Sequence, residues 1–189
     1  SSRGAFGRRR RYRGGRSGRG VSTGAALIVV DPSGENQIAV GSGANARVDP
    51  DRVRVAVSRA ADWGGAGCVL ISTEITPRAV VAAVKAAADK RIPCVVNPAP
   101  PVLDELVEVL SIPDILTPPN SSELRDLYAR TPSAGADHGS LTETEMAIAL
   151  AEGLEVTVIV TLGADGVLVV DPAGGGATSV PAGPVETVV

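Results

Sequence analysis

The sequence predicts an α/β fold: a mainly parallel sheet with helices on both faces, plus a small β-hairpin that projects from it. Short apolar runs alternate with helical segments along most of the chain, which is the element order of a parallel sheet. Hydrophobic residues form 44% of the 189 residues, and aromatic residues only 2%. The core must therefore consist of Val, Ala, Leu and Ile, which suit buried parallel strands. Two apolar runs near residue 30, separated by Pro and Gly, indicate the hairpin.

The hairpin and a first helix are the earliest elements expected. Residues 25–30 and 37–40 are typical of strands, and the connection 31–36 (DPSGEN) contains the turn residues Pro and Gly. Asp49 and Pro50 then offer an N-cap and a first-turn proline. A helix is therefore expected to begin there.

The remaining elements alternate in type. Strands are expected at 67–71, 93–96, 114–116, 156–161, 166–170 and 178–180. Helices are expected at 76–90, 121–130 and 142–152, the last opened by the capping-box sequence TETE. Open parallel sheets bind ligands beyond the carboxyl ends of their strands. Candidate site residues are therefore expected in the loops 72–74, 97–100, 117–123 and 161–166.

The net charge of −3 combines two segments of opposite sign. Residues 1–20 contain eight arginines and no acidic residue, and the remainder carries a net charge of −11. We expect residues 1–21 to be a disordered Arg/Gly-rich tail, because they have too little apolar surface to offset the entropy of ordering. Clustered arginines bind phosphates, which suggests nucleic acid. The acidic body offers no basic face to extend the patch, so no nucleic-acid partner is expected, and a translation or cloning artefact is the simpler interpretation.

Cysteine, histidine and apolar patterning restrict the protein class. Cys68 and Cys94 lie in apolar segments and are expected to be buried free thiols in a reducing compartment. The single histidine, His138, lies in a polar loop, so no His/Cys metal site is expected. The apolar runs are too short to span a bilayer, and no signal-peptide-like stretch follows the basic start. A cytoplasmic protein without a membrane partner is expected.

Several motifs, in order, resemble one known family. Residues 22–31 (STGAALIVVD) are similar to its lid hairpin, and residues 97–100 (NPAP) to a loop after a central strand. Residues 117–123 (TPPNSSE) resemble its Thr-Pro-Asn-x-x-Glu motif with an extra proline. Residues 158–167 (VIVTLGADGV) resemble its nucleotide-binding strand and loop, and residues 180–182 (VPA) follow as expected. The family is that of the ribokinase-like (phosphofructokinase-B type) carbohydrate kinases.

The resemblance covers residues 22–189 and implies a partial carbohydrate kinase domain. Members use ATP and Mg²⁺ to phosphorylate a sugar hydroxyl, and the hairpin and NPAP loop favour D-ribose, giving ribose 5-phosphate. Glu74 matches a carboxylate that accepts hydrogen bonds from ribose hydroxyls. A solvated acid preceding a helix is the alternative for Glu74. A homodimer through the lid hairpin is also implied.

The resemblance further implies a nucleotide and metal site. Glu123 matches a residue that holds Mg²⁺ through water, and a hard cation that keeps its waters needs only one or two protein oxygens. Asn120 matches a phosphate contact, with a simple helix cap as the alternative. The 161–166 loop is either the nucleotide loop or an ordinary turn between two strands. The implied nucleotide-binding residues are Asn120, Thr161, Leu162, Gly163, Ala164, Asp165 and Gly166.

The family's catalytic aspartate is expected beyond Val189, so no catalytic residue is assigned in this sequence. Ligands for the family's monovalent cation, K⁺, are expected in that same downstream segment. No upstream sugar-binding segment is matched, and the chain alone is therefore expected to be a poor catalyst. An inactive nucleotide-binding remnant and a fructokinase-like sugar kinase are the alternative functions.

Overall fold

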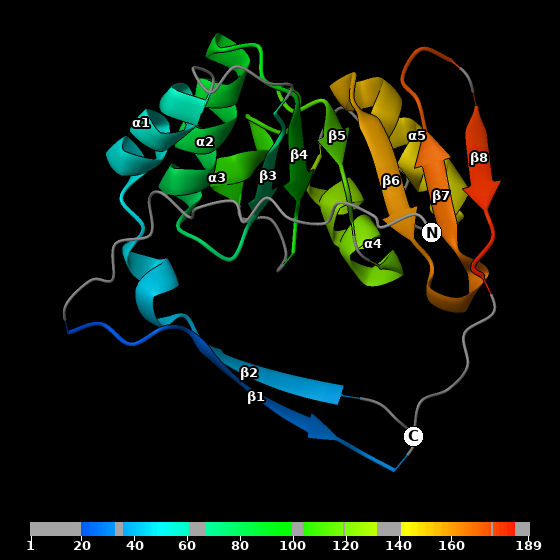
Figure 1. The fold of residues 1–189 in the computed structure, drawn as a ribbon. Helices are drawn as coiled ribbons and strands as arrows, with labels where there is room; N and C mark the ends of the chain where they lie inside the picture. Colours follow the sequence, from blue (N-terminus) through cyan, green and yellow to red (C-terminus); the bar gives the residue numbers. More distant parts are fainter. Residues whose placement is uncertain are drawn as a thin grey trace, which may run out of the picture.

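The computed structural model describes residues 20–32, 36–60, 67–99, 104–118, 120–131, 141–174 and 176–183. These residues form a six-stranded, mainly parallel sheet with helices and a separate two-stranded hairpin (Figure 1), which confirms the predicted α/β class and the separate hairpin. Residues 1–19 of the expected tail, and His138, lie outside the described residues. Every helix in the described ranges is too short or too polar to cross a bilayer.

The hairpin consists of β1 (Ala25–Val30) and β2 (Asn36–Gly41), as predicted. The strands pair antiparallel, with Leu27 opposite Ala39 and Ile28 opposite Ile38. The hairpin lies apart from the main sheet (Figure 1), and all of its strand residues are exposed. Its apolar side chains therefore contribute nothing to the core.

A short 3-10 helix, η1 (Gly43–Arg47), and the helix α1 (Pro50–Ala60) lead into the main sheet. The Oδ1 atom of Asp49 accepts the backbone N–H of Asp51 at 2.9 Å. The expected N-cap at Asp49 is therefore confirmed, and α1 begins at the predicted proline.

The main sheet has the strand order β3-β4-β5-β6-β7-β8. Its first four strands run parallel, and β7 and β8 are antiparallel to their neighbours. The connection between β6 and β7 contains only a 3-10 turn, η4 (Gly163–Asp165). A parallel pair needs a much longer crossover, so this short turn dictates the antiparallel end of the sheet. The strands are β3 (Val69–Ser72), β4 (Cys94–Asn97), β5 (Ile115–Leu116), β6 (Thr157–Thr161), β7 (Val167–Val170) and β8 (Ala177–Val180).

The helices between the strands agree with the sequence pattern except for one. The short helix α3 (Asp104–Val107) was not predicted, because its four residues are too few to show a helical period. The predicted capping box opens the last helix, where the backbone N–H of Thr142 donates to Glu145 Oε2 at 2.8 Å. The other helices are α2 (Pro77–Asp89), α4 (Ser121–Arg130) and α5 (Glu143–Leu154).

The buried side chains of the sheet lie on one face. The register places Ile71, Val96, Leu116 and Val158 in one row across β3 to β6. Each of the four is at most 5% exposed. Buried residues of α2, α3, α4 and α5 belong to the same core cluster. Right-handed crossovers between strands added in sequence order place every connecting helix on this same side.

The opposite face is more open. The row beside the buried one consists of Leu70, Val95, Ile115 and Thr157, in which Leu70 is 75% exposed and the other three are half-buried. Within the described residues, the expectation of helices on both faces is therefore met on one face alone. The sequence pattern gives the element order, but it does not give the side on which each new strand is added.

The two cysteines differ in environment. Both are free, and Cys94 is buried as expected, but Cys68 is exposed. Cys68 precedes β3, which is an edge strand of the sheet among the described residues, and this position explains the wrong expectation. Burial, together with the charges of Asp114 and Cys68, raises the pKa of Cys94 to about 11.

Candidate functional site

The carboxyl ends of β4, β5 and β6 meet at one edge of the sheet. Thr117, which follows β5, donates its N–H to the carbonyl of Val96 at 2.9 Å and its hydroxyl to the same oxygen at 3.3 Å. Thr161, the last residue of β6, donates its N–H to the carbonyl of Pro118 at 3.4 Å. These bonds align the three loops at the position where open parallel sheets bind ligands.

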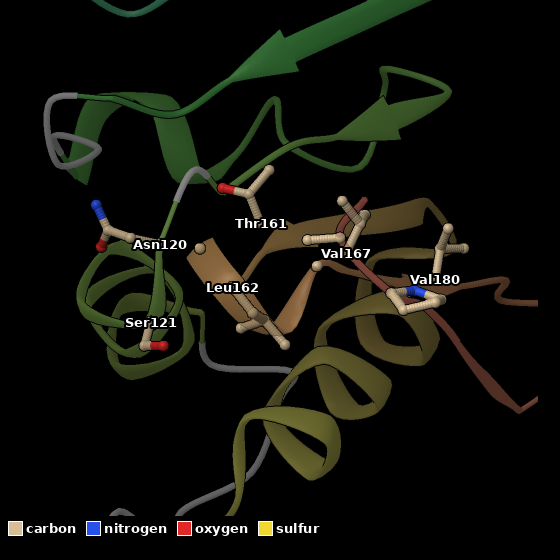
Figure 2. Close-up of a pocket in the computed structure, with 10 residues that line it drawn as sticks. Asn120, Ser121, Thr161, Leu162, Val167 and Val180 are labelled. Carbon is tan, nitrogen blue, oxygen red and sulfur yellow. The ribbon is translucent and has the colours of Figure 1, made fainter. Parts of the chain in front are cut away.

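A cavity of about 510 Å³ opens at this edge. Figure 2 shows Asn120 and Ser121, at the start of α4, on one side of it, and Leu162, Val167 and Val180 on another. Its volume lies in the range of small-molecule sites, roughly 300–1,000 Å³. The cavity is therefore large enough for a nucleotide-sized ligand.

Most of the predicted nucleotide-binding residues line this cavity. Ala164 and Asp165 belong to the same turn but are not among the lining residues. Five of the seven predicted residues do line it: Asn120, Thr161, Leu162, Gly163 and Gly166.

The turn after β6 depends on two glycines with different requirements. Gly166 has φ 95°, and a Cβ there would collide with the carbonyl of Val180 and lie 2.6 Å from the backbone nitrogen of Ala182. Only glycine fits this position. Gly163 also has a positive φ, 58°, but a Cβ there would meet nothing within 4 Å. The backbone at Gly163 is therefore open to a ligand.

Asn120 is the N-cap of α4. Its Oδ1 accepts the backbone N–H of Glu123 at 2.9 Å, so the capping role is real. Because the helix uses the oxygen, the amide NH₂ group is the end that remains for a ligand, and it is a donor. A donor suits a phosphate oxygen. Capping and phosphate binding are therefore compatible roles for this residue.

Glu123 lies in the first turn of α4 and is half-buried. Its Oε2 is buried without a hydrogen-bond partner among the described residues. Burial raises the pKa of Glu123 above its ordinary value, and the negative charge of Asp126 raises it further. An unpaired buried carboxylate oxygen is unfavourable until a donor or a cation reaches it.

The residues present fit a hydrated Mg²⁺ rather than a protein cage. Within the described ranges, no three His, Cys, Asp or Glu side chains gather into a metal-binding group. Mg²⁺ keeps several waters and is commonly bound through one or two carboxylates together with substrate phosphates. The unpartnered Oε2 of Glu123 suits a water of such an ion.

Glu74 lies on the same edge of the sheet but away from the cavity. It is exposed in the turn after β3, where its N–H donates to the hydroxyl of Ser72 at 3.4 Å. That hydroxyl donates to the carbonyl of Ala99 at 3.3 Å, which ties this loop to the one after β4. Three strand spacings, about 14 Å, separate β3 from β6. The structure therefore does not bring Glu74 together with the nucleotide residues.

Several lining residues were not predicted as ligand contacts: Ser121, Val167, Val180, Pro181 and Ala182. Antiparallel pairing places Val180 opposite Val167, beside the glycine turn. The sequence indicated the last strand, but its contact with the loop depends on the directions of β7 and β8, which follow from the short connections β6–β7 and β7–β8.

The fold and the cavity define an α/β protein with a candidate ligand site at the carboxyl edge of a mainly parallel sheet, between a glycine turn and a helix N-terminus. Residues 18–189 match the family described as pfkB family carbohydrate kinase. The chain therefore belongs to this family, which confirms the resemblance inferred from its motifs.

Individual relatives agree with this assignment. The chain is 36% identical over 148 residues to a ribokinase of Haemophilus influenzae, covering 78% of this chain and 45% of that protein. The crystal structure of a ribokinase from Thermotoga maritima superposes with a TM-score of 0.68 at 27% identity, over 89% of this chain and 51% of that one. An adenosine kinase of Anopheles gambiae shares the fold, with a TM-score of 0.71 at 18% identity, over 89% and 51% of the two chains. The chain thus spans about half the length of these proteins.

Proposed function

We propose that this chain supplies the nucleotide-binding part of a kinase that transfers the γ-phosphoryl group of ATP to D-ribose, giving ribose 5-phosphate. The observation that supports it most directly is the cavity between the glycine turn after β6 and the capped start of α4. Family membership supports the class of reaction.

Phosphoryl transfer depends on positioning and on stabilisation of charge. In this proposal the Asn120 amide donates to a phosphate oxygen, while Thr161 and the open backbone at Gly163 hold the nucleotide. Glu123 accepts hydrogen bonds from waters of Mg²⁺, and the bound ion neutralises phosphate charge. In these roles Asn120 presents a hydrogen-bond donor to the negatively charged phosphates. Glu123 presents an acceptor to the waters of the cation.

Ribose is the proposed phosphoryl acceptor. Glu74, at the same carboxyl edge of the sheet, is the residue proposed to bind it. Support comes from the identity to a ribokinase, whereas the adenosine kinase likeness concerns the fold alone. The cytoplasm is the proposed compartment, because its reducing conditions suit two free thiols.

A second copy of the chain is the proposed protein partner, through the hairpin. Ile28 and Ile38 lie opposite each other and are 56% and 54% exposed, and most of the other large side chains of both strands are apolar. Exposed apolar surface of this kind is typical of interaction sites.

Calorimetric titration of the 189-residue chain with ATP and Mg²⁺ tests the nucleotide site. Ser121→Phe should fill the cavity and weaken ATP binding at least about 10-fold, whereas Ser122→Phe, exposed on the same helical turn, should leave it unchanged. Absence of saturable ATP binding to the unmodified chain would contradict the proposal.

The substrate is tested separately with ribose, fructose and adenosine as acceptors for ADP release, in the chain and in any longer form of the protein. Glu74→Gln should weaken ribose binding more than ATP binding, by about 10-fold or more. An amide cannot accept two hydroxyl hydrogen bonds as a carboxylate does. A preference for fructose or adenosine would overturn the ribose assignment and leave the nucleotide site intact.

A further inference from the structure

Asn97, the last residue of β4, has a side chain with no role in the site described so far. Its backbone carbonyl accepts the N–H of Thr73 at 3.2 Å. Its side-chain Oδ1 is buried and has no hydrogen-bond partner among the described residues. Buried carbonyl oxygens are nearly always paired, so an orphan at a ligand-binding edge indicates a missing donor.

In the described part of the chain, the Oδ1 of Asn97 and the Oε2 of Glu123 are the two buried side-chain atoms without partners. Asn97 ends β4, and Glu123 lies in the first turn of α4, the helix that follows the neighbouring strand β5. Thr117 binds the carbonyl of Val96 with both its N–H and its hydroxyl, which fixes the end of β5 beside Asn97. The helix α4 begins four residues after Thr117, and the Asn120 cap holds Glu123 in its first turn.

The two orphan atoms have the same chemistry, because both are acceptors. A phosphate offers only acceptors and would not satisfy them. The waters around a divalent cation are donors. Mg–water distances are about 2.1 Å and water hydrogen bonds about 2.7 Å, so a hydrated ion satisfies acceptors about 5 Å from the metal on different sides.

We propose that Asn97 is a second acceptor for the hydrated divalent cation that Glu123 holds, so that the ion is positioned from the end of β4 and from the first turn of α4. This inference rests on the proposed nucleotide and metal site. Asn97 is a positioning residue here, because it acts through water. One carboxylate and one neutral amide give a weak site for the free ion, so the ion binds tightly only together with nucleotide phosphates.

Binding of Mn²⁺ to the full 189-residue chain, followed by electron paramagnetic resonance of the free ion with and without ADP, tests this assignment. Asn97→Leu removes the acceptor and should raise the Mn²⁺ dissociation constant in the presence of ADP about 10-fold, as for other groups that act through metal-bound ligands. Asn97→Asp keeps an acceptor oxygen and should bind Mn²⁺ at least as tightly as the unmodified chain. Asn36→Leu, at the exposed start of β2, is the matched control and should change nothing.

The outcomes separate this inference from the proposed function. If Asn97→Leu leaves Mn²⁺ affinity unchanged while Glu123→Gln weakens it, Asn97 has no part in the metal site and the function stands. If Asn97→Asp weakens Mn²⁺ binding as much as Asn97→Leu does, the Asn97 side chain acts as a donor and the inference is wrong. If the unmodified chain binds ADP neither with nor without Mn²⁺, the proposed function and this inference both fall. Affinity for metal-free ADP should stay within about two-fold in every variant, and melting curves check that each variant is folded.

Discussion

The amide oxygen of Asn120 accepts the backbone N–H of Glu123 at 2.9 Å, so one hydrogen bond starts α4 and orients two predicted ligand residues at once. The bond leaves the NH₂ group of Asn120 as a donor and fixes the backbone that carries the half-buried Glu123 carboxylate. A donor for phosphate and an acceptor for a hydrated cation therefore stand three residues apart with their roles already set.

Substitution of Asn120 should separate the cap from the ligand contact. Asn120→Asp keeps an N-cap oxygen but replaces the donor with a negative charge, so stability should hold while ATP affinity falls at least about 10-fold. Asn120→Ala should lose both the N-cap hydrogen bond and the donor for ATP. Loss of the cap should lower the free energy of unfolding by about 1 kcal/mol. Chemical denaturation and ATP titration of the two variants measure this. Equal ATP affinity for Asn120→Asp and the unmodified chain would contradict the donor role.

Glu123→Gln should make the metal-free protein more stable at neutral pH. Burial raises the pKa of Glu123 in the folded chain, so its stability contribution is fully present below the unfolded pKa and is lost as pH rises through the folded pKa. The uncharged Gln avoids this loss. The melting temperature of Glu123→Gln should exceed that of the unmodified chain at pH 8 and match it near pH 4. Lower stability of the variant at pH 8 would show that the ionised carboxylate has a favourable partner.

Gly166→Ala and Gly163→Ala should differ, although both glycines have positive φ. Ala at Gly163 faces open space and should cost only the left-handed backbone penalty, about 1–2 kcal/mol. Ala at Gly166 adds a collision with the backbone after β8 and should cost more, about 3 kcal/mol or above. Urea denaturation of the two variants gives the comparison. Equal losses would mean that the chain after β8 moves away at little cost.

The two thiols should react at very different rates. Cys68 is exposed, whereas Cys94 is buried with its pKa raised to about 11, so little Cys94 thiolate exists at pH 8. An aromatic disulfide reagent should label one thiol rapidly and the second only after denaturant is added. Cys68→Ser should abolish the rapid phase. Rapid labelling of that variant would show that the β3–β4 end of the sheet opens readily.

The hairpin should support self-association without supporting the body of the fold. Ile28 and Ile38 lie opposite each other on one face, both more than half exposed. The double variant Ile28→Asp, Ile38→Asp should turn a dimer into a monomer in sedimentation experiments. The melting temperature should change by no more than about 1 °C, because these side chains bury nothing in the core. Gln37→Asp, on the other face of the hairpin, is the control and should remain dimeric.

Elements whose signals are local could be predicted from the sequence. The Thr142–Glu145 capping box fixes the start of α5 within four residues, and Asn120 with Ser121 fixes the start of α4. The loops with candidate ligand residues followed from one rule about the carboxyl ends of parallel strands. Five predicted residues consequently line one cavity.

Properties that depend on distant contacts could not be predicted. Ala182 reaches the cavity through the antiparallel pairing of β8 with β7, and the exposed Cys68 precedes β3, an edge strand among the described residues. The oxygens Oδ1 of Asn97 and Oε2 of Glu123 are likewise buried without a partner among the described residues. A sequence shows that these residues are polar, but it does not show which of them lose their water on folding.

The strand order β3-β4-β5-β6-β7-β8 repeats the order of the chain. From β4 to β8, each strand therefore pairs with the strand made just before it, and among the described residues this sheet contains no pairing between remote strands. A sheet of this kind is able to grow by one strand at a time during synthesis on the ribosome, with each helix covering the newly added strand. The ligand edge then forms late, because it needs the end of β6 and the residues after β8 together.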